Sequence, residues 1–171
     1  TNPTIKDGWQ HCFTFPREVF VKDGKVCQKP VRELNAKKQQ LQDVQNELTQ
    51  SGCPVYEVNV DGIKENHFQA VLSDELILDY ENGRFQMHFT NKSKASVSTG
   101  RSLRYAKVDT LENVKILADT SAVEVFVNDG EFVFSTRYYP NDYKIVVHSP
   151  NAHITFNKIC LLYTSDAADE L

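Results

Sequence analysis

Apolar and polar residues alternate along much of the chain, and short turn signals separate the alternating runs. The runs VEVFV at 123–127 and FVFST at 132–136, for example, flank an Asp129-Gly130 dipeptide. A two-residue turn there places one set of cross-strand pairs on an apolar face: Val127/Phe132, Val125/Phe134 and Val123/Thr136. The opposite face then pairs Glu124/Ser135, Phe126/Val133 and Asn128/Glu131. Because a one-residue slip would mix the two faces, the pattern predicts both a hairpin and its register.

Five of the seven glycines follow Asp or Asn, a dipeptide that accepts the positive φ of type I′ turns. They lie at 7–8, 23–24, 61–62, 82–83 and 129–130. The turn at 82–83 pairs Leu76/Phe89, Leu78/Met87, Tyr80/Phe85 and Glu81/Arg84, and the turn at 23–24 pairs Val21/Val26 and Phe20/Cys27. We expect further strands at 54–60, 67–72, 95–98, 103–108, 114–118, 143–148 and 152–159. This density of short strands and turns predicts an all-β fold, an antiparallel two-sheet β-sandwich.

One segment, RELNAKKQQLQDVQNELTQSG at 32–52, does not alternate in this way. Its apolar residues recur at near-helical spacing, at Leu34, Leu41, Val44 and Leu48, and Gly52 could end a helix. The other residues are polar. Residues 35–51 are therefore expected to form either a marginal helix or a solvated linker with a few anchoring leucines.

Composition and charge narrow the function classes. The 171 residues are 40% hydrophobic and 25% charged, as in ordinary globular proteins. The net charge of −4 predicts neither nucleic acid nor an anionic membrane as a partner, and no apolar run approaches the ~20 residues that cross a bilayer. The four cysteines lack metal-ligand spacing, so we expect reduced thiols, no metal and no cofactor. This favours a cytoplasmic protein.

Four carboxylates, Asp119, Glu124, Asp129 and Glu131, are the strongest candidates for acid–base chemistry. The turn accounts for Asp129, a solvated strand start for Glu131, and the boundary of a strand for Asp119. Glu124 is the exception, because it lies mid-strand beside Phe126. If Glu124 is buried, we expect Arg137 or a backbone donor to pair with it.

The stretch KILADTSAVEVFVNDGEFVFSTRYYP at 115–140 resembles the signature hairpin of the C-terminal β-sandwich of glycoside hydrolase family 32. GRSLRYA at 100–106 is similar to the Gly-Arg-x-x-Arg strand before it, and residues 8–34 are similar to the end of the catalytic domain and the start of the linker. The family-motif positions, which we expect to be structural, are Arg17, Glu18, Arg101, Arg104, Glu124, Phe126, Asn128, Asp129, Gly130 and Arg137.

The resemblance implies a five-bladed β-propeller followed by the sandwich, and retaining hydrolysis by carboxylates on the propeller. The family places these carboxylates in Asn-Asp-Pro-Asn, Arg-Asp-Pro and Glu-Cys motifs, none of which occurs in this sequence. No catalytic residue is therefore carried over. We expect residues 1–34 to be a remnant of the last propeller blade and the start of the linker, and residues 35–159 to be the sandwich. Because CLLYTSDAAD resembles a translated sequencing adapter, residues 160–171 are expected to be a foreign tail on a fragment.

The resemblance also implies the function. The fragment is expected to be a non-catalytic structural domain of a β-fructofuranosidase-type glycosidase whose parent hydrolyses sucrose, sucrose 6-phosphate or fructans. Its partner is then the propeller of the same chain, and carbohydrate is bound only through the parent, which is cytoplasmic or, if it is of the levanase or inulinase type, secreted. The alternative function is that of a carbohydrate-binding module, which an exposed aromatic platform on one sheet would favour.

Overall fold

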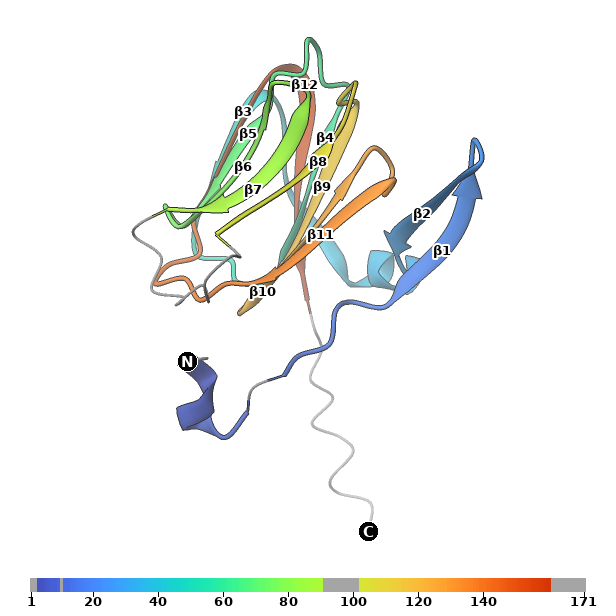
Figure 1. Cartoon of the computed structure of the whole chain (residues 1–171). Helices are drawn as coiled ribbons and strands as arrows, with labels where there is room; N and C mark the ends of the chain where they lie inside the picture. Colours follow the sequence, from blue (N-terminus) through green and yellow to red (C-terminus); the bar gives the residue numbers. More distant parts are fainter. Residues whose placement is uncertain (1–2, 10, 91–101, 161–171) are drawn as a thin grey trace.

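The structure is a computed structural model of the whole chain, and it describes residues 3–9, 11–90 and 102–160. These residues form two short 3-10 helices and twelve strands (Figure 1). In chain order the elements are η1 (Pro3–Asp7), β1 (Arg17–Lys22), β2 (Lys25–Pro30), η2 (Arg32–Lys37), β3 (Lys38–Gln50), β4 (Tyr56–Asp61), β5 (Gln69–Leu72), β6 (Leu76–Glu81), β7 (Arg84–Phe89), β8 (Leu103–Lys107), β9 (Asn113–Asp119), β10 (Ala122–Val127), β11 (Phe132–Arg137) and β12 (Ile145–Ile159). No helix among the described residues is long and apolar enough to cross a membrane.

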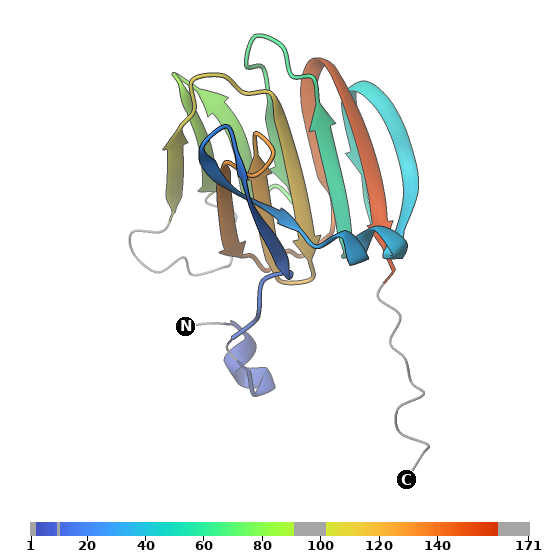
Figure 2. The same cartoon turned by 90° about the vertical axis from the view of Figure 1, so that its right-hand side faces the viewer.

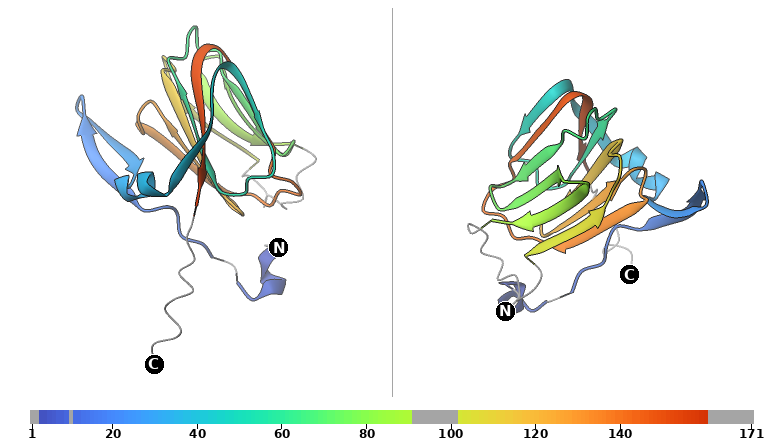
Figure 3. Two further views of the ribbon diagram at one scale, coloured as in Figure 1. Left: turned by 180° about the vertical axis from the view of Figure 1, so that it is seen from behind. Right: turned by 45° about the horizontal axis from the view of Figure 1, so that its top comes forward.

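Ten of the strands form an antiparallel β-sandwich, and β1 and β2 pair as a separate hairpin. The strands of the sandwich follow the order β11-β10-β9-β4-β12-β5-β6-β7-β8, and β3 pairs with the other edge of β12. β12 belongs to both layers, because Ile145–His148 pairs with β5 whereas His153–Lys158 pairs with β4. Figure 3 shows the two layers and the long strand that joins them.

The corner between the layers is built from two asparagines. Asn46 in β3 and Asn151 in β12 have φ values of 70° and 65°, a left-handed conformation that asparagine tolerates better than most residues. The backbone N–H of Asn151 donates to Oδ1 of Asn46 at 2.8 Å. The two paired strands therefore bend together from one layer into the other.

Apolar side chains that alternate along the strands fill the space between the layers. Phe85 is fully buried, and its ring lies 5.8 Å from Phe68 and 5.3 Å from Phe134. Tyr56 stacks on Phe156 with ring centroids 5.1 Å apart. The structure confirms the predicted registers of the hairpins that turn at residues 23–24, 82–83 and 129–130. Alternation and turn chemistry together therefore predicted these three elements correctly.

Other predictions of turns and strands need correction or concern residues that the structure does not describe. The dipeptides at 7–8 and 61–62 do not form hairpin tips, because one lies at the end of η1 and the other at the end of β4, where a loop follows. The runs at 143–148 and 152–159 are one strand, β12, because Pro150 and Asn151 occupy its bend. The strand predicted at 95–98 lies outside the described residues.

Residues 35–51 form neither an α-helix nor a linker. They begin in η2 and continue as the 13-residue strand β3, which pairs with β12. The register of this pairing shifts twice, once near Leu41 and once between Val44 and Leu48. The shift near Leu41 inserts that residue into β3, whereas at the other shift the extra residues lie in β12, between His148 and His153. The near-helical spacing thus combines the inserted Leu41 with Val44 and Leu48, whose separation of four residues keeps both on one face of the strand.

Candidate functional site

The N-terminal segment covers the outer face of the layer that contains β4, β9 and β10. Leu117, Phe126 and Ile159 are buried on this face, outside the main core. Phe15 and Leu34, which flank the β1–β2 hairpin, pack against them. Figure 2 shows the hairpin crossing this face of the sandwich. We call the contact between residues 15–34 and the sandwich the seam.

Glu124 holds the start of the hairpin at the seam. Its side chain points outward from β10, yet the residue is only 2% exposed. One carboxylate oxygen accepts from the backbone N–H of Phe15 at 2.6 Å, and the other accepts from Arg17 at 2.9 Å and 2.5 Å. Arg17 also donates to Ser135 Oγ at 2.8 Å, and its guanidinium lies 5.3 Å from the centre of the Phe126 ring. The buried carboxylate is therefore satisfied by a charge-assisted fork and a backbone donor.

The prediction for the partner of Glu124 is confirmed for the backbone donor and wrong for the arginine. A backbone donor pairs with it, as expected, but the arginine is Arg17 and not Arg137. Arg137 instead donates Nε to the carbonyl oxygen of Ser121 at 3.1 Å and lies 5.0 Å from the ring centres of Trp9 and Tyr139. Arg17 takes the place beside Glu124 because the docked hairpin brings it there from 107 positions away in the chain.

The other two carboxylates of the β10–β11 hairpin also bind basic residues of β1–β2. Lys22 Nζ lies 2.5 Å from Asp129, and Lys25 Nζ lies 2.6 Å from Glu131. These hydrogen bonds to Asp129 and Glu131 raise the pKa values of Lys22 and Lys25, respectively. We call the three pairs Arg17–Glu124, Lys22–Asp129 and Lys25–Glu131 the clasp. Carboxylates that suggested acid–base chemistry in the sequence therefore anchor a neighbouring segment.

Gly130 completes the clasp through its backbone. The N–H of Gln28 donates to the carbonyl oxygen of Gly130 at 3.0 Å. A Cβ at Gly130 would lie 1.7 Å from the carbonyl oxygen of Gln28, and the φ of Gly130 is 86°. Only glycine satisfies both the turn and this close approach. The sequence pattern explained the turn but gave no signal for the contact with β2.

The remaining family-motif positions brace the surroundings of the seam. Glu18 pairs with Lys29 at 3.2 Å, and the hydrogen bond from Lys29 lowers the pKa of Glu18. Asn128 accepts from the N–H of Glu112 and donates to the carbonyl oxygen of Thr110, which fixes the loop before β9. Arg104 donates to the carbonyl oxygen of Ser135 and so ties β8 to β11. Arg101 lies outside the described residues.

A buried carboxylate that sequence reasoning missed lies beside the seam. Glu57 in β4 is 1% exposed, and it pairs with Lys38 at 2.7 Å and Lys115 at 3.4 Å. Burial raises the pKa of Glu57, but Lys115, Lys38 and Asn59 outweigh burial, so the pKa lies below its ordinary value. The only signal in the sequence is that Glu57 alternates with Val58 and so faces outward. Its burial depends on lysines from two other strands.

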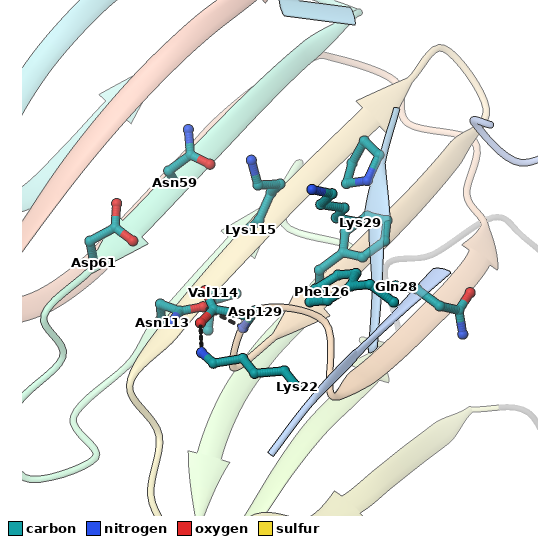
Figure 4. Close-up of a pocket in the computed structure, with 12 residues that line it drawn as sticks. Lys22, Gln28, Lys29, Asn59, Asp61, Asn113, Val114, Lys115, Phe126 and Asp129 are labelled. Carbon is teal, nitrogen blue, oxygen red and sulfur yellow. Dashed lines mark hydrogen bonds and ion pairs between the residues drawn. The ribbon is translucent and has the colours of Figure 1, made fainter. Parts of the chain in front are cut away.

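A polar groove of about 450 Å³ lies between the hairpin and the sheet (Figure 4). Its floor is a square of four side chains, in which Asn59 and Asp61 of β4 lie opposite Lys115 and Asn113 of β9. The hairpin contributes a wall, and the Lys22–Asp129 pair closes one end. Phe20, Phe126 and Pro30 add apolar surface to the lining. Within the part of the chain that the structure describes, no cluster of three His, Cys, Asp or Glu residues could hold a metal ion.

Known proteins share both the sequence and the fold. The family model described as glycosyl hydrolases family 32 C terminal matches residues 67–160. A raffinose invertase of Escherichia coli is 31% identical over 151 residues, which cover 81% of this chain and 31% of the invertase. A sucrose-6-phosphate hydrolase of Bacillus subtilis is 27% identical over 148 residues, which cover 82% of this chain and 30% of the hydrolase. The chain spans about a third of the length of these curated relatives.

Solved structures show the same architecture. A sucrose-6-phosphate hydrolase from Lactobacillus gasseri aligns with a TM-score of 0.82 at 19% identity, over 93% of this chain and 36% of the hydrolase. A β-fructofuranosidase of Bombyx mori aligns with a TM-score of 0.71 at 18% identity, over 94% of this chain and 35% of that enzyme. The match of the family model covers more than half of the chain. The chain therefore belongs to glycoside hydrolase family 32, and it corresponds to the C-terminal β-sandwich of that family.

Proposed function

We propose that this chain is the non-catalytic C-terminal part of a β-fructofuranosidase-type glycosidase, and that its sandwich anchors the segment leading in from the catalytic part. The observation that carries the proposal is the clasp. It fixes β1–β2 to the sandwich through three ion pairs and the Gln28–Gly130 backbone hydrogen bond. In this role the sandwich is a platform for the hairpin and, through it, for the catalytic part.

The free side of the hairpin supports this role. Val19, Val21 and Val26 share one face of the hairpin and are 67%, 71% and 65% exposed. No further strand pairs with the outer edge of β1 among the described residues. A two-stranded sheet with an apolar exposed face is marginal by itself in water. We therefore propose that the catalytic part of the longer protein covers this face, as residues of the last blade of its propeller would.

The chemistry of the clasp supports a non-catalytic role. A retaining glycosidase needs two carboxylates about 5–5.5 Å apart that flank the bond to be cleaved. Both oxygens of Glu124 are already occupied by Phe15 and Arg17, and Asp129 and Glu131 are paired with lysines. The three catalytic motifs of the family are also absent from the sequence.

The proposal extends to the organisation of the chain. Residues 1–34 belong to the end of the catalytic domain and the linker, residues 35–159 form the sandwich, and residues 160–171 are foreign to the natural protein. The names of the relatives, a raffinose invertase and a sucrose-6-phosphate hydrolase, support sucrose, sucrose 6-phosphate or a related fructoside as the substrate of the parent. The cysteines Cys12, Cys27, Cys53 and Cys160 are all free, which suits a reducing cytoplasm.

The rival function, a carbohydrate-binding module, would need an exposed aromatic platform. The exposed aromatic side chains in the described part of the chain are Trp9, Phe13 and Tyr105. Only Tyr105 lies on a strand, and the guanidinium of Arg84 lies 4.7 Å from the centre of its ring. These positions support the anchoring role over a binding platform.

The test compares the chain with the full-length protein that its upstream coding sequence specifies. Both are incubated with sucrose, sucrose 6-phosphate, levan and inulin, and released fructose is measured. The full-length protein is expected to hydrolyse at least one sugar, and the chain alone none. In the full-length protein, Glu124→Gln should lower the thermal midpoint of activity, whereas the exposed control Glu47→Gln should not. Release of fructose by the chain alone that Glu124→Gln abolishes would overturn the proposal.

A further inference from the structure

The turn between β6 and β7 leaves a reactive pair of groups unprotected. Asn82 and Gly83 are the two residues between the strands, and Asn82 is exposed. The side-chain amide of Asn82 makes no hydrogen bond to another residue that the structure describes. The backbone N–H of Gly83 likewise has no acceptor within the described ranges. A backbone nitrogen and the side-chain carbonyl carbon that it can attack are therefore both available on the surface.

The turn between β10 and β11 protects the same kinds of group. The N–H of Gly130 donates to the carbonyl oxygen of Val127 at 3.1 Å. The side chain of Asn128 is bonded through both its oxygen and its nitrogen to the loop before β9. The carbonyl oxygen of Gln28 crowds Gly130, whereas nothing lies within 4 Å of a Cβ added at Gly83. The two turns therefore differ in how freely their backbone nitrogens can react.

Asn82 also differs from the other asparagines of the chain. Hydrogen bonds hold the side chains of Asn35, Asn46, Asn59, Asn66, Asn113, Asn128, Asn141 and Asn157. Asn151 is not among them, but Ala152 follows it, and the Cβ of an alanine hinders attack by its own nitrogen. Asn82-Gly83 is the only Asn-Gly pair in the sequence. The reactive dipeptide and the unprotected conformation therefore coincide at this turn.

An asparagine before a glycine can lose its side-chain amide without an enzyme, and asparagine is among the thermolabile residues of proteins. The nitrogen of Gly83 attacks Cγ of Asn82, and the new N–Cγ bond replaces the bond from Cγ to Nδ2. Ammonia leaves with the proton of the Gly83 N–H, and a five-membered succinimide ring remains. Water then opens the ring at one of its two carbonyls. Opening at Cγ gives aspartate, whereas opening at the backbone carbonyl gives isoaspartate, in which the main chain runs through the former side chain.

We propose that Asn82 is a site of spontaneous deamidation in the folded protein, and that the isoaspartate form loosens the neighbouring end of β8. The carbonyl oxygen of Gly83 accepts from the N–H of Val108 at 3.0 Å, and Tyr80 Oη donates to the carbonyl oxygen of Val108 at 2.6 Å. Isoaspartate adds a carbon to the backbone of a two-residue turn, so the carbonyl of Gly83 moves away from Val108. The site is independent of the proposed anchoring role, because no residue of the clasp belongs to β6, β7 or β8.

The experiment ages the intact folded chain in mildly alkaline buffer and follows its peptides by mass spectrometry. The peptide that holds Asn82 should gain the mass difference between an NH₂ and an OH group, and it should separate into aspartate and isoaspartate forms on chromatography. The rate should rise in proportion to hydroxide, because the nitrogen of Gly83 attacks after it has lost its proton. It should lie within about tenfold of the rate in the chain unfolded in urea, which is a barrier difference below about 1.4 kcal/mol. The amide of Val108 should exchange faster in the isoaspartate form.

Two variants separate the effect of structure from that of sequence. Asp129→Asn places an Asn-Gly pair in the protected turn, and this pair should deamidate at least about tenfold more slowly than Asn82 in the same folded molecule. Asn82→Gln should abolish the early release of ammonia, and thermal midpoints check that both variants are folded.

Any one of four results would overturn the proposal. Asn82 could keep its mass in the folded chain while the chain in urea reacts, or both turns of folded Asp129→Asn could react equally fast. Asn82→Gln could release ammonia as fast as the unaltered chain, which would place the reaction elsewhere. The amide of Val108 could stay equally protected in the isoaspartate form, which would show that the turn does not hold the end of β8.

Discussion

The hairpins β1–β2 and β10–β11 meet at the seam with the same strand lengths and an Asp-Gly pair in each turn, yet different forces hold them. Each consists of two six-residue strands, and each turns at an Asp-Gly pair with positive φ. In β10–β11, Val123, Val125 and Val127 are fully buried in the main core. In β1–β2 the corresponding valines are exposed, and the hairpin is held by the clasp. Turn chemistry therefore specifies a hairpin, and the surface beneath it determines the hairpin's stability.

The largest expected effect comes from removing the same two methyl groups in each hairpin. Val125→Ala should lower the free energy of unfolding by about 2–3 kcal/mol, because the side chain is 0% exposed in the core. Val21→Ala, at a position that is 71% exposed, should change it by less than about 0.5 kcal/mol. Urea unfolding of the two variants measures both values. Equal losses would show that the two hairpins are held alike.

Gly130→Ala should release β1–β2 without unfolding the sandwich. The added Cβ would overlap the carbonyl oxygen of Gln28, and the positive φ would itself be strained. Gly83→Ala is the matched control, because Gly83 has a φ of 74° in a hairpin turn and no atom within 4 Å of an added Cβ. The strain alone should cost about 1 kcal/mol, and Gly130→Ala should cost more.

Hydrogen exchange locates the effect of this glycine pair. The amide of Gln28 should exchange faster in Gly130→Ala and at an unchanged rate in Gly83→Ala, while the amides of β4 and β12 stay protected in both variants. Unchanged protection of Gln28 in Gly130→Ala would contradict the close approach that the structure shows.

Glu57→Gln should make the protein less sensitive to acid. The pKa of Glu57 is below its ordinary value of 4.5 in the folded state, so its stabilising contribution is present above that value and is lost as the pH falls through the folded pKa. The variant should be less stable than the unaltered chain at pH 7 by about 1–2 kcal/mol, and the difference should shrink below pH 4.5. Thermal melts across pH 3–7 measure this, with the exposed Asp61→Asn as control. A difference that does not depend on pH would rule out this role of the carboxylate.

The smallest effect should come from the exposed pairs of the clasp. Lys22→Gln and Lys25→Gln remove charges from pairs that water and salt already screen. The global stability should not change measurably, but hairpin amides should exchange a few-fold faster at low salt, and the difference should vanish in high salt. A salt-independent difference would mean that these lysines act through packing.

The sequence alone was sufficient for the features that local chemistry controls. Asn82-Gly83 and Asp129-Gly130 specified the turns, and alternation then set which residues face the core, as Val125 and Phe134 do. The strand β3 was missed because the residue inserted at Leu41 and the four-residue spacing of Val44 and Leu48 together mimic a helical period. Its pairing partner β12 is about 100 residues away in the chain. The pattern of residues within β3 carries no information about a partner so distant in the sequence.

The site was less predictable than the fold, for the same reason. The carboxylates of β10–β11 were visible in the sequence, and Glu124 was rightly singled out as the residue that the turn does not explain. Its partner Arg17 lies 107 positions away in the chain. No local sequence pattern indicates that Gly130 contacts Gln28. Only the docked position of the hairpin reveals that these residues act together.

The central place of β12 bears on how the chain is made on the ribosome. Residues 145–159 are the last strand that the structure describes, and they lie between β3 on one side and β4 and β5 on the other. Until this strand leaves the exit tunnel, β3, β4 and β5 have been synthesised but lack the partner that joins them. Such unpaired edges are templates for aggregation, and pairing over long sequence separation is slow. A nascent chain that stops before Ile145 therefore exposes unpaired, aggregation-prone strand edges, which chaperones would have to shield. The two layers close only when synthesis has passed Ile159.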